Sequence, residues 1–382
     1  MLNWAKIEIS SGSARSSAMD EFFFRPRKIF VREDCRDYPL VGRVLGRLSG
    51  TPVEYIEDEE ALLQKFREGR TPVSDGKSLL LLTRQKGSFV KPCPCTPEYV
   101  GCNYYIINLD LNCPLDCSYC ILQNYLSNPL ITIHVNTDDL WSELDGFLDQ
   151  NDRFLRIGTG ELGDSLALDP LTGRSYDLID YFRVRPKALF ELKTKTVNIG
   201  GVLKTDPAEN IIIAWSLNAS AMAASEEQGA PTIEERIAAA SQVVDRGYRV
   251  AFHFDPLIIF PGWREGYARV IQLLLSSIDH SRIAWISLGS LRFPPQLKHT
   301  IARRFPDSRI IYEELVAGKD GKLRYFYPLR KELCLTVIDH FRSVGGTDIA
   351  FYFCMEGERM WRDCLDKKIK GKEEVERLLS LP

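Results

Sequence analysis

The sequence has no long hydrophobic run. Across 382 residues, no uninterrupted apolar stretch approaches the ~18 residues that a membrane-spanning helix needs. Residues 1–6 also lack the charged start and the apolar core of a signal peptide. We therefore expect a cytoplasmic protein with no membrane partner.

The chain also lacks a large excess of charge of either sign. Its 49 basic and 52 acidic residues give a formal net charge of −3. This balance excludes the broad positive field of a non-specific nucleic-acid binder, although it leaves room for a local basic patch. Hydrophobic residues make up 45% of the sequence, which is ample for a buried core.

Cysteine is present in number but is unevenly placed. Six of the ten cysteines lie between Cys93 and Cys120, and the other four are Cys35, Cys334, Cys354 and Cys364. In a reducing compartment, such clustering indicates metal binding before it indicates disulfides.

Strand and helix patterns alternate through the middle of the chain. Amphipathic stretches such as 232–245 and 264–277 indicate helices between short apolar runs at 104–109, 154–157, 188–192, 211–215, 249–254 and 283–288. This alternation predicts an α/β fold with a parallel sheet. Six units suit a partial (β/α)6 TIM-type barrel, and an open α/β sheet is the alternative. In both, ligands gather at the carboxyl ends of the strands.

The flanking segments predict smaller units. Strand, helix and strand patterns at 28–32, 41–48 and 53–56 indicate a small α/β lobe, which we assign to residues 1–90. The barrel is expected over residues 91–310. A β-hairpin and a C-terminal helical extension are expected over residues 311–382, with Asp320-Gly321 as the hairpin turn.

Three cysteines share one short loop after the first predicted barrel strand. They are Cys113, Cys117 and Cys120. A four-iron cluster usually takes four thiolates, so three would leave one iron open to another molecule. The alternative, a structural zinc site, needs four closed ligands, and the triplet offers no second pair. The loop therefore predicts a 4Fe-4S iron–sulfur cluster.

This spacing, with Tyr119 just before the last cysteine, resembles the signature of the radical S-adenosylmethionine superfamily. Gly158-Thr-Gly-Glu161 resembles the motif with which that superfamily binds the methionine amino group. Glycine permits close approach to a ligand, and glutamate supplies charge for an ammonium. The resemblance implies S-adenosylmethionine as cofactor, a 5′-deoxyadenosyl radical, and a reducing partner such as flavodoxin or ferredoxin.

Further segments extend the resemblance to the spore photoproduct lyase family, radical enzymes that reverse a thymine dimer in spore DNA. They are residues 113–123, 135–140, 163–169, 216–218, 246–249, 262–267, 292–293 and 303–306. By this resemblance Lys193 and Ser216 fall where the lyases contact the methionine carboxylate, beside Glu161 as a further cofactor-binding residue. A lysine charge and a serine hydroxyl suit that contact.

Two more side chains share a face of a predicted strand, His253 and Asp255. With Tyr119 and Glu161 they complete our candidate catalytic set. His253 either orients or protonates the substrate, or it is a core histidine with its hydrogen bonds satisfied.

The chain departs from the lyase pattern where the lyases return a hydrogen atom to the product radical. Glu161 stands in place of the cysteine that donates it, and Ile121 replaces a tyrosine after the cluster cysteines. At the hairpin, Asp320 stands where a wedge aromatic would be. An acid at the tip would repel DNA phosphates, so DNA is an uncertain partner.

Additional cysteines form the third departure. They are Cys93, Cys95, Cys102 and Cys354. Three interpretations compete: an auxiliary iron–sulfur cluster, a replacement thiol that donates hydrogen, and inert structural thiols. We favour the auxiliary cluster.

These patterns predict a radical enzyme resembling spore photoproduct lyase. Repair of a thymine photoproduct in DNA is the leading activity, and radical modification of a peptide or small metabolite is the alternative. A non-catalytic iron–sulfur redox sensor is a third possibility. Lys193, Ser216 and the Gly-Glu motif argue against the sensor, because it has no use for a methionine site.

Overall fold

A computed structural model describes residues 23–69 and 73–380. The small lobe contains a five-stranded sheet with the order β2-β1-β3-β8-β6. Its elements are β1 (Lys28–Arg32), α1 (Pro39–Arg47), β2 (Val53–Ile56), α2 (Glu59–Glu68), α3 (Val73–Gly76), β3 (Leu79–Thr83), β6 (Asp110–Leu111) and β8 (Ile131–His134). Every residue of β3 is buried, and apolar clusters cover both faces of the sheet. This explains why β3 forms a continuous apolar run instead of an alternating one.

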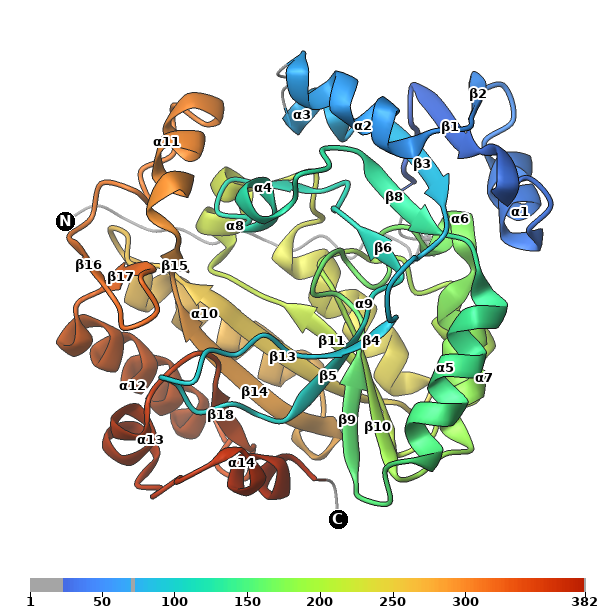
Figure 1. The fold of residues 1–382 in the computed structure, drawn as a ribbon. Helices are drawn as coiled ribbons and strands as arrows, with labels where there is room; N and C mark the ends of the chain where they lie inside the picture. Colours follow the sequence, from blue (N-terminus) through green and yellow to red (C-terminus); the bar gives the residue numbers. More distant parts are fainter. Residues whose placement is uncertain (1–22, 70–72, 381–382) are drawn as a thin grey trace, which may run out of the picture.

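The second sheet has eight strands in the order β18-β14-β13-β11-β10-β9-β5-β4. They are β4 (Val90–Pro92), β5 (Tyr104–Ile107), β9 (Leu155–Gly158), β10 (Ala188–Thr194), β11 (Ile211–Ser216), β13 (Arg249–Leu257), β14 (Ile283–Ser290) and β18 (Phe351–Phe353). All neighbours pair in parallel except β4 and β5. The sheet curls into the predicted partial barrel, and all six predicted strands are confirmed (Figure 1).

Helices cover the outer face of this sheet (Figure 1). They include α5 (Thr137–Asp149), α7 (Arg174–Arg183), α9 (Ile233–Asp245), α10 (Trp263–Ser277) and α12 (Tyr327–Ser343). Helix α9 begins at a capping box, in which Thr232 and Glu235 satisfy each other's backbone amides. The sheet and helices share one core, which contains the fully buried Phe190, Trp215 and Trp285.

The shorter elements connect the strands and helices of the lobe and the barrel, or follow the barrel. They are η1 (Glu33–Cys35), β7 (Asp116–Cys117), α4 (Leu122–Tyr125), α6 (Asp169–Thr172), η2 (Val202–Lys204), α8 (Ser220–Glu226), β12 (Glu227–Gln228), η3 (His280–Arg282), β15 (Arg292–Phe293), α11 (Pro295–Arg304), β16 (Leu315–Ala317), β17 (Leu323–Tyr325), α13 (Glu358–Leu365) and α14 (Lys372–Leu379). No helix in the described ranges is long and apolar enough to cross a bilayer.

The sheets interleave across the segments that we expected as separate units. Strands β6 and β8 come from the expected barrel segment but pair within the lobe sheet. Strand β18 comes from the expected C-terminal extension but forms an edge of the barrel sheet. The predicted hairpin of β16 and β17 is present, and β15 joins it as a third strand.

Candidate active site

The loop with the cysteine triplet leaves the lobe sheet after β6. Its middle strand β7 pairs antiparallel with β12, so Cys117 lies opposite Glu227. Asn112 takes a positive φ of 68°, a conformation that asparagine tolerates better than most residues. Its side-chain oxygen accepts a hydrogen bond from the Cys113 amide at 2.9 Å. The chain therefore enters the triplet in a fixed conformation.

The three thiols are electrostatic neighbours, since Cys117 and Cys120 both act on Cys113. Cys117 is buried and the other two are half-buried. Burial raises the pKa of Cys117 to about 12. Burial also raises the pKa of Cys113, and charges on Asp164, Cys120 and Cys117 raise it further. Three neighbouring thiols fit one iron–sulfur cluster. Each thiol must lose its proton when it binds iron.

Two cations from other segments of the chain contact this loop. Lys77 of the lobe donates to the Leu115 carbonyl at 2.5 Å and lies 3.0 Å from the Asp116 carboxylate. Arg304 of α11 contacts the same carboxylate at 2.8 Å. Sequence analysis missed Lys77, because it follows a charged segment of the lobe and belongs to no motif. Only the folded chain brings it to the cluster loop.

The three predicted cofactor-binding residues end neighbouring strands. Glu161 lies on the loop after β9 and is exposed, Lys193 is the penultimate residue of β10, and Ser216 is the last residue of β11. These strands are parallel neighbours, so the three residues lie at the same end of the barrel. That end is the one at which ligands gather in such folds.

The local structure requires glycine at the two positions Gly158 and Gly160, before Glu161. A Cβ at Gly158 would lie 1.9 Å from the Tyr104 hydroxyl and 2.5 Å from the Glu191 carbonyl. Gly160 has a φ of +89°, which strains any residue with a side chain. The Gly-x-Gly sequence therefore lets the loop lie against strand β10.

Lys193 and Ser216 keep their polar ends available. Among the described residues, no hydrogen bond or ion pair engages Lys193 Nζ or Ser216 Oγ. Burial lowers the pKa of Lys193, but charges on Glu161 and Glu191 outweigh burial and raise it. Lys193 is therefore a cation at neutral pH, stabilised by the charges of two acids.

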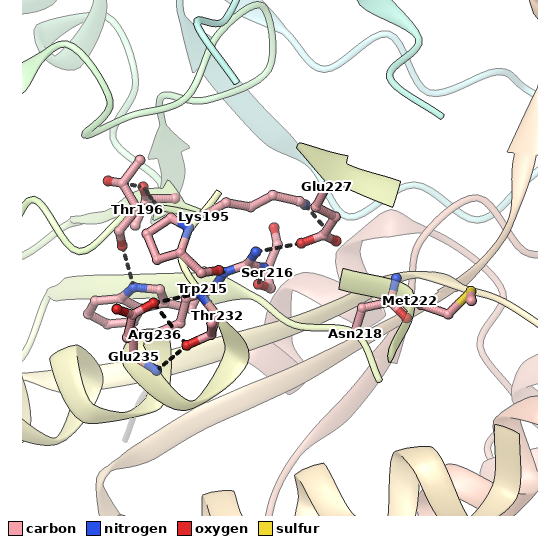
Figure 2. A network of polar contacts seen from close by, with 12 residues as sticks. Lys195, Thr196, Trp215, Ser216, Asn218, Met222, Glu227, Thr232, Glu235 and Arg236 are labelled. Atoms are coloured by element: carbon pink, nitrogen blue, oxygen red, sulfur yellow. Dashed lines mark hydrogen bonds and ion pairs between the residues drawn. The ribbon is translucent and has the colours of Figure 1, made fainter. Parts of the chain in front are cut away.

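A buried ion-pair network connects the cluster loop to the end of β11 (Figure 2). Arg236 of α9 lies 2.6 Å from the Glu227 carboxylate and donates to the Ser216 carbonyl at 3.0 Å. Burial raises the pKa of Glu227, but the charges of Lys195 and Arg236 outweigh it and lower that pKa. The Tyr119 hydroxyl donates to the same carboxylate. Sequence analysis missed Glu227, Arg236 and Lys195, because none of them belongs to a motif, although Arg236 and Glu227 share one short segment of the chain.

His253 and Asp255 both have partners in the barrel interior. His253 Nε2 lies 2.8 Å from the Glu191 carboxylate. Burial raises the pKa of Glu191, but the charge and hydrogen bond of His253 outweigh burial and lower it to about 2. Asp255 receives two hydrogen bonds from Arg292, at 2.8 and 2.9 Å. The two side chains therefore hold neighbouring groups in place.

The hairpin tip corrects one expectation. The Asp320 side chain is 1% exposed, so the view that it presents an acid to DNA is wrong. It accepts from Arg324 at 2.6 Å and from the Tyr99 hydroxyl at 3.4 Å, and these two groups turn it inward. Lys319, its neighbour at the tip, is exposed instead.

A family model described as "Spore photoproduct lyase" matches residues 95–341, which is more than half of the chain. The chain belongs to the spore photoproduct lyase family. It is 24% identical to the spore photoproduct lyase of a Geobacillus species over 317 residues, which cover 80% of this chain and 91% of that protein.

Solved structures of spore photoproduct lyase have the same fold. A cysteine-to-alanine mutant superposes with a TM-score of 0.74 at 23% identity, covering 87% of this chain and 99% of that one. A double mutant with bound AdoMet and dinucleoside spore photoproduct gives 0.71 at 22% identity, covering 86% and 98%.

Family membership makes this chain a radical S-adenosylmethionine enzyme. Enzymes of this family use a 4Fe-4S cluster and S-adenosylmethionine, and AdoMet is bound in the second of these solved structures. The cysteine triplet fits the cluster, since it supplies three neighbouring thiols on one fixed loop. Membership of a family of enzymes also argues against the non-catalytic redox sensor.

Proposed function

We propose that this enzyme directs a 5′-deoxyadenosyl radical at a thymine photoproduct in DNA. The observation that carries the proposal is the family match, which spans residues 95–341 and so includes both the cluster loop and the hairpin of β16 and β17. The inward turn of Asp320 supports it, because the acid that argued against DNA binding is not at the surface.

Each cofactor is assigned its own set of residues. Cys113, Cys117 and Cys120 hold the cluster, Glu161 binds the methionine amino group, and Lys193 and Ser216 bind its carboxylate. When bound, the cluster supplies the electron that cleaves S-adenosylmethionine to a 5′-deoxyadenosyl radical. The free Lys193 ammonium and the unpaired Ser216 hydroxyl support these assignments, since a carboxylate needs donors that are not already engaged.

The remaining candidate catalytic residues act by positioning. His253 holds Glu191, which lies close enough to Lys193 to keep that lysine charged. Asp255 fixes Arg292 at the mouth of the barrel. Tyr119 is fixed by its hydrogen bond to Glu227, which ties the cluster loop to the strand ends. Each of the three side chains makes a hydrogen bond to another side chain of the protein.

The expected partners follow from this chemistry. DNA meets exposed basic residues on two neighbouring segments, Lys319 at the hairpin tip and Arg303 on α11. A flavodoxin or ferredoxin supplies the electron. The ten cysteines are all free thiols, which suits the reducing conditions of the cytoplasm.

A single assay tests the proposal. The reconstituted enzyme is given a dinucleoside spore photoproduct, S-adenosylmethionine and dithionite without oxygen, and the products are separated by chromatography. Restored thymidine residues are expected together with 5′-deoxyadenosine. An enzyme that forms 5′-deoxyadenosine and leaves the lesion intact would refute the repair activity.

One observation favours a second candidate, radical modification of a peptide or small metabolite. Glu161 stands where the lyases place the cysteine that returns a hydrogen atom, and a carboxylate is a poor hydrogen-atom donor. Incubation in deuterated water separates the two candidates. Repair through a thiol places deuterium in the restored thymidine, whereas a reaction on another substrate leaves the photoproduct unlabelled and unchanged.

A further inference from the structure

Four cysteines outside the cluster loop lie at the mouth of the barrel. Cys93, Cys95 and Cys102 belong to the connection between β4 and β5, at one edge of the barrel sheet. Cys354 directly follows β18, at the opposite edge. We call these four residues the mouth cysteines.

The curl of the sheet brings the two edges together. The Val100 amide donates to the Glu356 carbonyl at 3.0 Å, so the loop after β18 is bonded to the β4–β5 connection. In Figure 1 that connection passes beside β18 and α13. The Cys93 amide also donates to the Tyr104 carbonyl at 2.8 Å, which fixes Cys93 against the start of β5.

The thiols themselves are electrostatic neighbours. Burial raises the pKa of Cys93 to about 12, and charges on Glu161, Cys102 and Cys95 contribute. Burial likewise raises the pKa of Cys354, with contributions from Cys102 and Cys93. All four are half-buried and unpaired. Cys93 and Cys354 also interact electrostatically with Lys193, so these two thiols lie near the proposed methionine site.

Two buried guanidinium groups give this region positive charge. Arg292 donates to the Cys354 sulfur at 3.4 Å. Arg156 is 1% exposed and donates to the Cys102 carbonyl at 3.4 Å, and its Nε and Nη2 have no hydrogen-bond partner among the described residues. The rings of Tyr104, Trp285 and Tyr352 and the charge of Glu191 already stabilise this guanidinium, and a further anion would take up its unsatisfied donors. A cluster held by four thiolates is such an anion.

We propose that Cys93, Cys95, Cys102 and Cys354 bind a second iron–sulfur cluster, a four-iron cluster with all four irons ligated by protein. Within the described ranges, no three cysteine, histidine or acidic side chains are grouped tightly enough to chelate one metal ion. That spacing disfavours zinc. A cluster distributes its ligands over four irons, so it accepts thiols that are further apart. The site does not depend on which substrate the enzyme acts on.

Iron content in two complementary variants tests the proposal. The full chain is reconstituted anaerobically with ferrous iron and sulfide, and about eight irons per chain are expected. The triple variant Cys113→Ala, Cys117→Ala, Cys120→Ala is expected to keep about four irons, with an electron paramagnetic resonance signal that S-adenosylmethionine does not change. The quadruple alanine variant of the mouth cysteines is expected to keep about four irons and to form 5′-deoxyadenosine.

The matched control is Cys35→Ala combined with Cys334→Ala, two buried thiols outside both sets, which should keep the full iron content. Circular dichroism checks that each variant is folded, and the single change Cys354→Ser replaces the quadruple variant if that one is not. A folded triple variant without iron overturns the proposal, as does zinc in place of iron. Failure to repair a photoproduct changes neither iron count.

Discussion

The cluster loop and the mouth cysteines hold their thiols in different ways. The cluster loop places three cysteines within eight residues, and a short strand pair and the carboxylate of Asp116 fix them locally. The mouth cysteines are separated by up to 261 residues of sequence, as Cys93 and Cys354 show, and they meet because the barrel sheet curls. The positions of the first three thiols depend on one loop, whereas the positions of the mouth cysteines depend on the whole fold.

The largest effect is expected when one cysteine of the cluster loop is replaced. We expect Cys117→Ala to reduce 5′-deoxyadenosine formation by more than about 100-fold, because a metal site loses up to that much from changes to its outer shell alone. The readout is 5′-deoxyadenosine released under dithionite. Cys35→Ala, a fully buried thiol in the lobe core, is the control and should keep its activity. Equal activity in the two variants would remove the cluster assignment.

The next largest effect is expected where the loop joins the barrel. Arg236→Met keeps most of the side-chain volume but leaves the buried Glu227 carboxylate without its closest cation. Breaking a buried ion pair on one side costs about 3–5 kcal/mol. Urea unfolding measures this loss in the apo protein. The control is Glu234→Gln on the same helix, at an exposed position, and an equal loss there would show that the network does not hold the loop.

Sequence analysis predicted the elements that short, local sequence patterns specify. The six barrel strands followed from short apolar runs, and the cysteine triplet from its spacing. The hairpin turn was also predicted, and Gly321 has the positive φ that such a turn needs. The direction of the Asp320 side chain was not, since it depends on Arg324 and on Tyr99 from another segment.

The same limit explains the missed residues near the cluster. Lys77, Glu227 and Arg236 belong to no motif. They contact groups outside their own segments, which are the Leu115 carbonyl, the Tyr119 hydroxyl and the Ser216 carbonyl. The mouth cysteines were found because cysteine is rare. Whether thiols from two sheet edges meet depends on the closure of the barrel, which periodicity alone did not distinguish from an open sheet.

Acid should weaken the cluster-loop side of the molecule. Burial, together with the charge of Arg174, lowers the pKa of His134 from 6.5 to about 4, and its ring contacts the Asn108 carbonyl before the loop. The unfolded chain therefore binds more protons between these pH values, so stability is full above pH 6.5 and falls toward pH 4. The expected loss is about 3 kcal/mol.

Urea unfolding of the apo protein across this pH range measures the effect. His134→Gln removes the titrating group, so its free energy of unfolding should depend less on pH than that of the wild type. His299→Gln, on the exposed side of α11, serves as the control and should keep the wild-type slope. If His134→Gln keeps that slope too, this histidine is not the source of the acid sensitivity.

The smallest effect is expected from the contact between the lobe and the cluster loop. Lys77→Met removes a charged hydrogen bond to the Leu115 carbonyl, but Asp116 keeps Arg304 as a partner. The loss in the free energy of unfolding should therefore be about 2 kcal/mol, the range of one charge-assisted hydrogen bond. Lys86→Met is the control, because that lysine is 69% exposed and its contact with an acid is long, at 3.8 Å.

Iron loss tests whether the lobe also fixes the position of the loop. If it does, Lys77→Met loses iron from the cysteine triplet faster than Lys86→Met in the presence of a chelator, while both variants retain iron at the mouth cysteines equally. Equal loss from the triplet would mean that β7, β12 and Arg304 fix the loop without the lobe.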